Sequence, residues 1–218
     1  MQTNIQLSRF FAILVIFIGL TACQSAYYSA MEKVGVHKRD IMLSRVDDAK
    51  ESQQQAQQQF KSALDQLSQL INFEGGDLEE QYELINDQYQ ASKNAADDVS
   101  TRIAKIEDVA TALFDEWQDE IGQYSSEKLK RQSQSKLKQT ERRYHKLIKV
   151  MVKAESKMAP VLAALKDNSL YLKHNLNAQA IGALQGEYQS IKKDVEVLVK
   201  EMNSAIAQSQ QFIDLLKP

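Results

Sequence analysis

The sequence predicts an all-α fold: an elongated antiparallel four-helix bundle, or coiled coil, with up-down-up-down topology. Glycine and proline are scarce, at 7 and 2 in 218 residues, while Gln, Lys, Glu, Asp and Ala are abundant. Apolar residues are spread singly and recur in alternating steps of three and four, which is the spacing of one helix face. We therefore expect helix throughout the chain after about His37.

The first expected helix has an unbroken apolar seam and ends at a glycine-containing turn, Asn72-Phe73-Glu74-Gly75-Gly76. A seam of this period predicts one face packed against partner helices. Its members are Met42, Val46, Ala49, Gln53, Ala56, Phe60, Ala63, Leu67 and Leu70.

The second expected helix begins after Asp77, an N-cap residue with Glu80 three positions later, as in a capping box. Gly122 and Ser125-Ser126 mark its expected end. Its seam consists of Leu78, Tyr82, Ile85, Tyr89, Ser92, Ala96, Val99, Ile103, Ile106, Ala110, Leu113 and Trp117, followed by Ile121 and Tyr124.

The third expected helix continues past Pro160, which removes one backbone donor and predicts a kink without requiring an end. Its seam is Leu137, Thr140, Tyr144, Leu147, Met151, Ala154, Met158, Leu162 and Leu165. The stretch His174-Asn175-Leu176-Asn177 forms the next turn, with Asn177 as N-cap. The last seam is Ile181, Leu184, Tyr188, Ile191, Val195, Leu198, Met202, Ala205, Ser209, Phe212 and Leu216.

The loop positions predict how the helices are paired. Folding the chain at Ser125-Ser126 sets Leu78 opposite Lys173, so the first and third turns lie at one end. Roughly ten residues of the second and third helices then project as a bare hairpin on the order of 15 Å long. A continuous rod that runs straight through Ser125 is the alternative topology.

The second and third helices carry opposite charges. Residues 77–120 contain thirteen acidic and three basic side chains, whereas residues 127–157 contain three acidic and eleven basic ones. Basic stretches can indicate nucleic-acid or anionic-lipid binding. An acidic helix of matching length and a net charge of −2 instead favour solvated helix faces, and no nucleic-acid partner is expected.

A thin layer interrupts the apolar seams where Ala49, Gln53 and Ala56 face Ser92 and Ala96. A buried polar residue in a helical bundle commonly fixes the register of the helices. The same small side chains also leave room for a ligand between the helices, so both interpretations stay open.

Catalytic patterns are missing from the sequence. The three histidines, His37, His145 and His174, are far apart and match no metal-ligand or nucleophile-base spacing. No Gly-rich phosphate loop occurs. We expect a non-enzymatic protein without catalytic residues, cofactor-binding residues, metal ligands or a cofactor.

The N-terminus has the pattern of a signal peptide. Arg9 precedes eleven apolar residues, 10–20, and then come the small residues Thr21 and Ala22. Eleven residues form about 16 Å of helix, well short of the ~30 Å hydrocarbon core of a bilayer. The expected division is a signal peptide at 1–22, an acylated tether at 23–36 and an elongated helical bundle at 37–218.

The stretch Leu20-Thr21-Ala22-Cys23 contains the one cysteine of the chain and resembles the lipobox of bacterial lipoproteins. The resemblance implies that Cys23 becomes the first mature residue and carries acyl chains, which together hold a protein firmly on a bilayer. The absence of an aspartate after Cys23 implies sorting to the outer membrane. The expected location is its periplasmic face, with the membrane as a partner through the lipid anchor.

Two further stretches, residues 27–40 and 172–181, resemble an uncharacterised family of Gram-negative bacterial lipoproteins known as a domain of unknown function. The resemblance implies a helical lipoprotein and brings no activity or ligand with it. Its distinctive residues are the candidates for recognition: Tyr27, Tyr28, His37, His174, Asn175 and Asn177.

Two functions follow from the sequence. The first is a structural spacer or adaptor that is anchored at the hairpin end and engages an unknown envelope protein or the cell wall at its distal tip. The alternative is a binding module that holds a small or lipidic ligand between helices near Gln53 and Ser92. With the anchor near the hairpin, Trp117 either contacts the membrane or covers the core of the hairpin.

Overall fold

The computed structural model describes residues 27–73 and 75–217, and within them the fold is all-α, as predicted. Five long helices follow one another along these residues, with no strand between them. They are α2 (Lys38–Ile71), α3 (Leu78–Gly122), α4 (Glu127–Ser156), α5 (Met158–His174) and α6 (Ala178–Leu216). The expected signal peptide and Cys23 lie outside the described residues.

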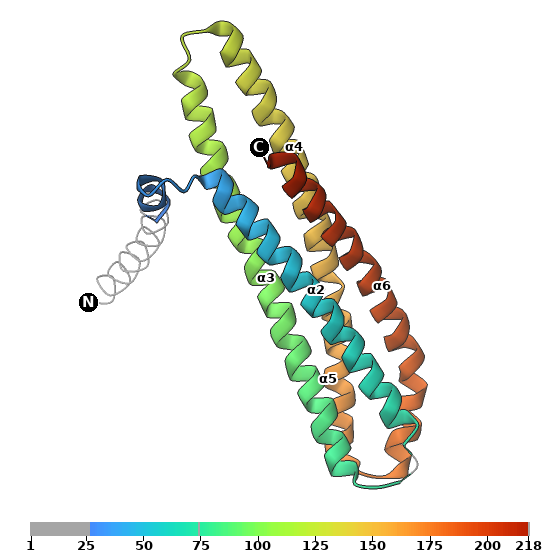
Figure 1. The fold of residues 1–218 in the computed structure, drawn as a ribbon. Helices are drawn as coiled ribbons and strands as arrows, with labels where there is room; N and C mark the ends of the chain where they lie inside the picture. The colour runs from blue at the N-terminus through green and yellow to red at the C-terminus, as the bar shows by residue number, and fades with distance from the viewer. Residues whose placement is uncertain (1–26, 74, 218) are drawn as a thin grey trace, which may run out of the picture.

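The five helices lie along one long axis and form a rod (Figure 1). α2 packs against α3 and α6, α3 also packs against α4 and α5, and α6 contacts α4 and α5. Along the chain, α2 and α3 run in opposite directions, and so do α5 and α6 (Figure 1). α3, with 45 residues, has a length of about 68 Å and sets the length of the rod.

The predicted seams form the core. Every seam residue of α2 is buried, and Met42, Val46, Phe60 and Leu67 have no exposed surface. The centre of the α3 seam is largely enclosed, whereas the seam residues at its two ends are half-buried or exposed, apart from Ile121, which is buried. The period of the apolar residues therefore predicted the buried face of each helix correctly, because the helices pack along most of their length.

The expected turns are confirmed by their caps. The Asp77 carboxylate accepts hydrogen bonds from the backbone N–H groups of Glu79 at 2.8 Å and Glu80 at 3.4 Å. Asn177 Oδ1 likewise accepts from Gln179 at 3.0 Å and Ala180 at 3.2 Å. These side chains satisfy backbone donors that have no partner inside the helix.

The third expected helix is divided into two. α4 ends at Ser156 and α5 begins at Met158, so the chain has five long helices in its described part instead of four. Pro160 has no N–H to donate to the carbonyl of Ser156, and its ring crowds that carbonyl. Lys157 keeps a right-handed helical conformation, with φ −84° and ψ −11°, and α5 continues along the rod (Figure 1).

The continuous-rod alternative is wrong, because α3 and α4 fold back on each other as a hairpin. Trp117 Nε1 donates a hydrogen bond to Ser133 Oγ at 2.8 Å, across the two helices. Further along, the rings of Phe114 and Tyr144 lie edge to face with centroids 5.4 Å apart.

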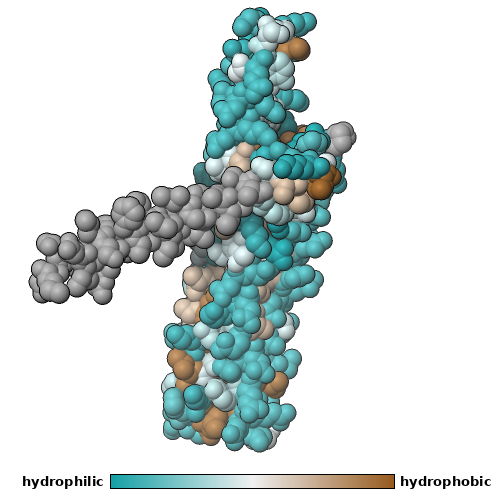
Figure 2. Space-filling view, turned by 90° about the vertical axis from the view of Figure 1, so that its left-hand side faces the viewer, coloured by the Kyte–Doolittle hydropathy of each residue, from teal (hydrophilic) through white to brown (hydrophobic). Residues whose placement is uncertain are grey.

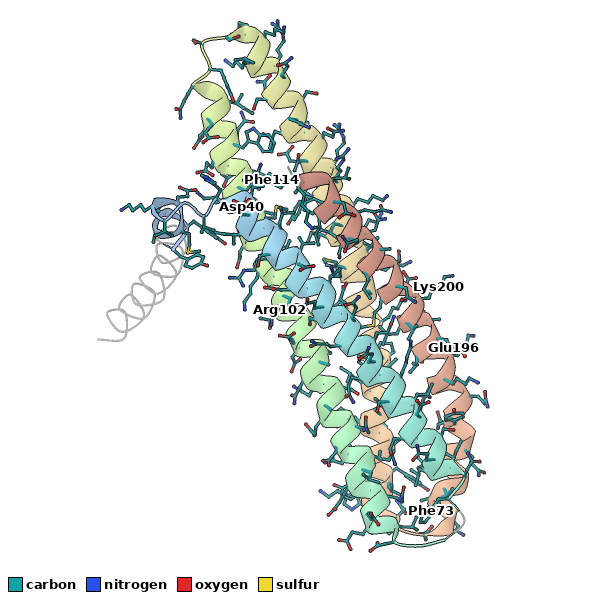
Figure 3. The ribbon with its side chains drawn as sticks, viewed as in Figure 1. Asp40, Phe73, Arg102, Phe114, Glu196 and Lys200 are labelled. Atoms are coloured by element: carbon teal, nitrogen blue, oxygen red, sulfur yellow. The ribbon has the colours of Figure 1, made fainter. Side chains whose placement is uncertain are left out.

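The hairpin projects beyond the rest of the rod, as the loop positions predicted (Figure 1). α2 begins, and α6 ends, well below the turn between α3 and α4. The ion pair between Lys38 Nζ and Glu116 Oε1, at 2.9 Å, marks the level at which α2 begins. Asp40 and Phe114 also lie at this level, and Phe73 lies at the opposite end (Figure 3).

Packing begins earlier in the chain than the expected boundary at residue 37. Residues 27–33 are helical, and Tyr28 belongs to the core, with 6% of its surface exposed. Lys38 donates a hydrogen bond to Glu32, which connects this segment to the start of α2. The sequence did not predict this contact, because the segment is too short to show a periodic seam.

Candidate functional site: a groove at the base of the hairpin

The described residues form a groove of about 780 Å³ at the base of the hairpin. It lies where α2 begins and α6 ends while α3 and α4 continue. We call it the hairpin groove. Its lining residues are Glu32, His37, Lys38, Arg39, Leu113, Glu116, Trp117, Glu120, Lys136, Gln139, Thr140, Arg143, Leu215, Leu216 and Lys217.

The apolar part of the hairpin groove comes from α3 and α6. Leu113 and Leu216 are partly buried against the core, and Trp117 is half-buried one turn beyond Leu113. Leu113 and Trp117 continue the α3 seam to the level where α2 begins and α6 ends, and Leu216 is the last residue of α6. Leu215, at the rim, has 53% of its surface exposed.

Two of the basic residues that line the hairpin groove, Lys136 and Arg143, come from α4, and the others are Lys38, Arg39 and Lys217. Lys136 and Arg143 are seven residues apart, which places them two turns apart on one helix face. Between them, Thr140 Oγ1 donates to the carbonyl of Lys136 at 3.0 Å. Among the described residues, neither Lys136 nor Arg143 forms an ion pair within 4.0 Å.

At the start of α2, Lys38 forms ion pairs with two carboxylates that line the groove, those of Glu32 and Glu116. Its ammonium group contacts Glu32 and, at 2.9 Å, Glu116 Oε1. Burial by itself lowers the pKa of Lys38, but its hydrogen bonds to Glu32 and Glu116 outweigh burial, and its pKa is raised. The hydrogen bond from Lys38 also lowers the pKa of Glu32. One ammonium group between two carboxylates leaves these three side chains with a net charge of −1. The positive charge of the groove therefore comes from its other basic residues, among them Lys136 and Arg143 on α4.

Tyr144 lies next to the hairpin groove on α4. Burial, together with the charges of Glu107 and Asp108, raises the pKa of the Tyr144 phenol to about 12. The phenol therefore stays protonated at neutral pH. Its ring packs against Phe114, so its position is explained by the core of the hairpin.

The structure divides the recognition candidates between the two ends of the rod. Tyr27, Tyr28 and His37 lie at the hairpin end, where His37 is exposed and lines the hairpin groove. Tyr27 and Tyr28 pack edge to face with centroids 5.4 Å apart. Tyr27 is 44% exposed, whereas Tyr28 is buried in the core, so the two tyrosines offer different surfaces to a partner.

The second group of candidates lies at the distal turn between α5 and α6. His174 is exposed at the last position of α5, where a cationic side chain is favoured by the helix dipole. Asn175 Nδ2 donates to the carbonyl of Tyr171 at 2.9 Å, while Asn177 caps α6. Both asparagines therefore have a local structural role.

Apolar side chains are exposed beside this distal turn. Leu170, Tyr171 and Leu176 have 47%, 43% and 43% of their surfaces exposed. On the face drawn in Figure 2, hydrophobic residues also show at the end of the rod away from the hairpin, whereas the hairpin is almost entirely hydrophilic. We call Leu170, Tyr171 and Leu176 the distal apolar residues.

The thin layer that the sequence predicted is enclosed. Gln53 and Ser92 both have no exposed surface, and neither amide atom of Gln53 has a hydrogen-bond partner among the described residues. Ser92 Oγ accepts a long contact of 3.5 Å from Gln59 Nε2. The polar character of this layer is confirmed, and a ligand there stays a prediction.

The acidic and basic helices are neighbours, as predicted, but they do not exchange ion pairs. In the part of the chain that the structure describes, α3 pairs with α2 through Arg102 and Asp48 at 3.4 Å. α4 pairs with α6 through Lys153 and Glu201 at 2.8 Å. No pair within 4.0 Å joins α3 to α4 over residues 78–156.

Over residues 27–73 and 75–217, no helix combines the length and the apolar character that a membrane crossing requires. The same residues contain no group of three or more His, Cys, Asp and Glu side chains placed to hold a metal ion.

The sequence pointed to Leu113 and Trp117 as seam residues. Arg143 stood out only as part of the basic stretch 142–146, for which a solvated helix face was favoured over anionic-lipid or nucleic-acid binding, and Lys136 was not proposed as a binding residue. The sequence did indicate where such a groove could form. The loop positions predicted that the first helix begins, and the last helix ends, at the level of residues 113 and 136. Which side chains of α4 face that space depends on helix rotation, and the loop positions do not contain this information.

The protein is thus an all-α rod in which the α3–α4 hairpin projects beyond the other helices and forms a groove at its base. The family model of DUF2959, described as a protein of unknown function, matches residues 27–216. The chain belongs to this family. No curated protein and no solved structure matches it.

Proposed function

We propose that this protein is an outer-membrane-anchored periplasmic lipoprotein that acts as a non-enzymatic spacer or adaptor in the cell envelope. Cys23 carries the lipid anchor. The pattern of Arg9, the apolar run 10–20 and the stretch Leu20-Thr21-Ala22-Cys23 supports this attachment.

A spacer needs length and stiffness, and the topology supplies both in this proposal. In this proposal α4 and α5 count as one kinked helix, so that the chain forms an elongated up-down-up-down four-helix bundle. A rod with the length of α3 spans on the order of 70 Å. Helices paired along most of this length resist bending more than a single helix does.

The observation that carries the adaptor role is the position of the distal apolar residues. Leu170, Tyr171 and Leu176 are exposed within seven positions of one another, beside Asn175. Exposed aromatic and aliphatic side chains that gather at one place favour a protein interface. In the proposed orientation the hairpin end lies near the membrane, because Tyr27 is four residues from Cys23. The distal turn then reaches into the periplasm toward an envelope protein or the cell wall.

Replacing the anchor tests the attachment. In the Cys23→Ser variant we expect loss of acylation and release of the protein from the outer-membrane fraction. Fractionation at high salt, followed by mass spectrometry of the N-terminal peptide, measures both. If the variant stays with outer membranes at high salt, lipid anchoring is not the main attachment.

In-cell photocrosslinking tests the adaptor role. A photoreactive residue at Leu170 is expected to capture one envelope component reproducibly, because this position lies on the proposed interface. The control places the same residue at Val152 on α4, which is also apolar and 43% exposed. Equal capture patterns from the two positions would contradict a distal interface.

A further inference from the structure

The apolar side chains of the hairpin groove come from α3 and α6, and its basic side chains come from α4, from Lys38 and Arg39 at the start of α2, and from Lys217 after α6. Leu113 and Trp117 come from α3 and Leu216 from α6, whereas Lys136 and Arg143 come from α4. A ligand that fits such a groove has one apolar and one charged part, side by side.

The apolar side chains of the groove are only partly covered because of the topology. Along the closed part of the rod, α2 and α6 cover the seams of α3 and α4, and most of those seam residues are buried. At the groove, the apolar residues Leu113, Trp117 and Leu216 are half-buried and keep part of their surface exposed. A hydrocarbon chain placed there would remove apolar surface from water, at about 25 cal/mol per Å².

The sign of the charge in the groove selects an anion. Lys38 is occupied by Glu32 and Glu116, which leaves Glu120 as the remaining acidic side chain of the lining. Lys136 and Arg143 stand without an ion pair in the described part of the chain. An arginine fork and a lysine ammonium suit a carboxylate or phosphate headgroup.

We propose that the hairpin groove binds an amphiphile with one hydrocarbon chain and an anionic headgroup. Arg143 and Lys136 contact the headgroup, and Leu113, Trp117 and Leu216 contact the chain. A volume of about 780 Å³ is within the range of about 300–1,000 Å³ that is usual for small-molecule sites. This inference does not depend on the lipid anchor or on the distal interface.

Trp117, the one tryptophan of the chain, reports on this site directly. We would titrate the full chain carrying Cys23→Ser with dodecyl phosphate below its micelle concentration and follow the emission of Trp117. A saturable change is expected. Dodecyl maltoside, with the same chain and a neutral headgroup, is expected to bind about tenfold more weakly, and inorganic phosphate alone is expected to give no saturable change.

Charge variants locate the headgroup. Arg143→Gln is expected to weaken dodecyl phosphate binding about tenfold, which is the loss of one charge-assisted contact. The matched control is Arg142→Gln, because Arg142 is exposed, adjacent in sequence and not part of the lining. Circular dichroism of both variants checks that the helices are intact.

Two further probes distinguish the source of the ligand. Palmitate in solution represents a free long-chain acid, and vesicles with phosphatidylglycerol represent a membrane lipid; a saturable response to either supports the proposal and identifies the source. Equal affinity for dodecyl maltoside and dodecyl phosphate overturns it. So does equal weakening by Arg142→Gln and Arg143→Gln, or the lack of saturable binding by every amphiphile.

Discussion

The bundle around Phe60 and the hairpin around Trp117 are built from similar seams but have different surroundings. Phe60 has no exposed surface, because α2 lies between α3 and α6. Trp117 is half-buried and hydrogen-bonds across the hairpin to Ser133 at 2.8 Å. One helical period therefore gives a closed core or an open groove, according to where the neighbouring helices end.

Truncating the closed core is expected to have the largest effect. Phe60→Ala should lower the free energy of unfolding by about 3–5 kcal/mol, because it leaves a cavity in an enclosed site. Urea denaturation followed by circular dichroism measures this. Trp117→Ala in the hairpin serves as the comparison, and a loss as large as that of Phe60→Ala would contradict the difference between the two regions.

The distal glycine turn is expected to be the next most sensitive place. Gly76 has φ +133°, and an added Cβ would lie 2.8 Å from Phe73 Cζ. Gly76→Ala should therefore destabilise the protein by about 1–3 kcal/mol. Gly186→Ala on α6 is the control, since a Cβ there meets nothing within 4 Å, and it should stabilise by about 0.5–1 kcal/mol. Thermal unfolding of both variants decides whether the two substitutions act in opposite directions.

The Gln53 amide has no hydrogen-bond partner among the described residues, so replacing it offers a way to stabilise the core around Phe60. Gln53→Met has a similar length and removes two buried polar atoms that lack partners, so stability should rise by about 1–2 kcal/mol. Gln54→Met, at an exposed neighbouring position, should change stability by less than about 0.5 kcal/mol. A loss of stability in Gln53→Met would indicate that a buried water molecule or ligand satisfies the amide.

The hairpin is expected to respond locally. Ser133→Ala removes the acceptor of the Trp117 indole N–H and should cost about 0.5–1 kcal/mol. Amide hydrogen exchange should increase near the α3–α4 turn and stay unchanged around Phe60. The reason is that the hairpin can open locally while the bundle around Phe60 stays folded. Ser135→Ala, at an exposed position, provides the baseline, and uniform exchange changes along the rod would contradict independent opening.

The smallest expected effect is a pH dependence in the closed section. The Ser52 hydroxyl donates to Asp98 Oδ2 at 2.6 Å, and this hydrogen bond, helped by Arg102 and opposed by burial, lowers the pKa of Asp98. A lowered folded-state pKa gives stability that is present above the ordinary value of 3.8 and is lost as the pH falls through the folded value. Asp98→Asn should flatten this acid-side loss in urea titrations, and an unchanged slope would show that other carboxylates cause it.

Much of the fold could be predicted because its information is local. The caps Asp77 and Asn177 precede their helices directly. Every predicted seam residue of α2 from Met42 to Leu70 is buried, since burial follows a fixed period, although Ile41 and Ser52 are buried as well. The interruption at Lys157 was only partly predictable. Pro160 indicates a kink, but whether a helix continues through it depends on the packing of its neighbours.

The recognition candidates show the limit of such local information. The sequence placed Tyr27 and Tyr28 together as neighbours, and the structure buries Tyr28 while leaving Tyr27 44% exposed. Tyr28 is buried because it packs against the core of the helical bundle. Residues distant in sequence decide that contact, so no short motif predicts it.

The helices, their buried faces, most of their ends and the projecting hairpin could all be predicted from local sequence patterns. The reason is that hydrogen bonding and apolar periodicity within a helix involve residues three and four positions apart. The side chains that meet at the base of the hairpin depend instead on how the helices pack together. Leu113, Arg143 and Leu216 share the groove because three helices of different length and rotation come together there.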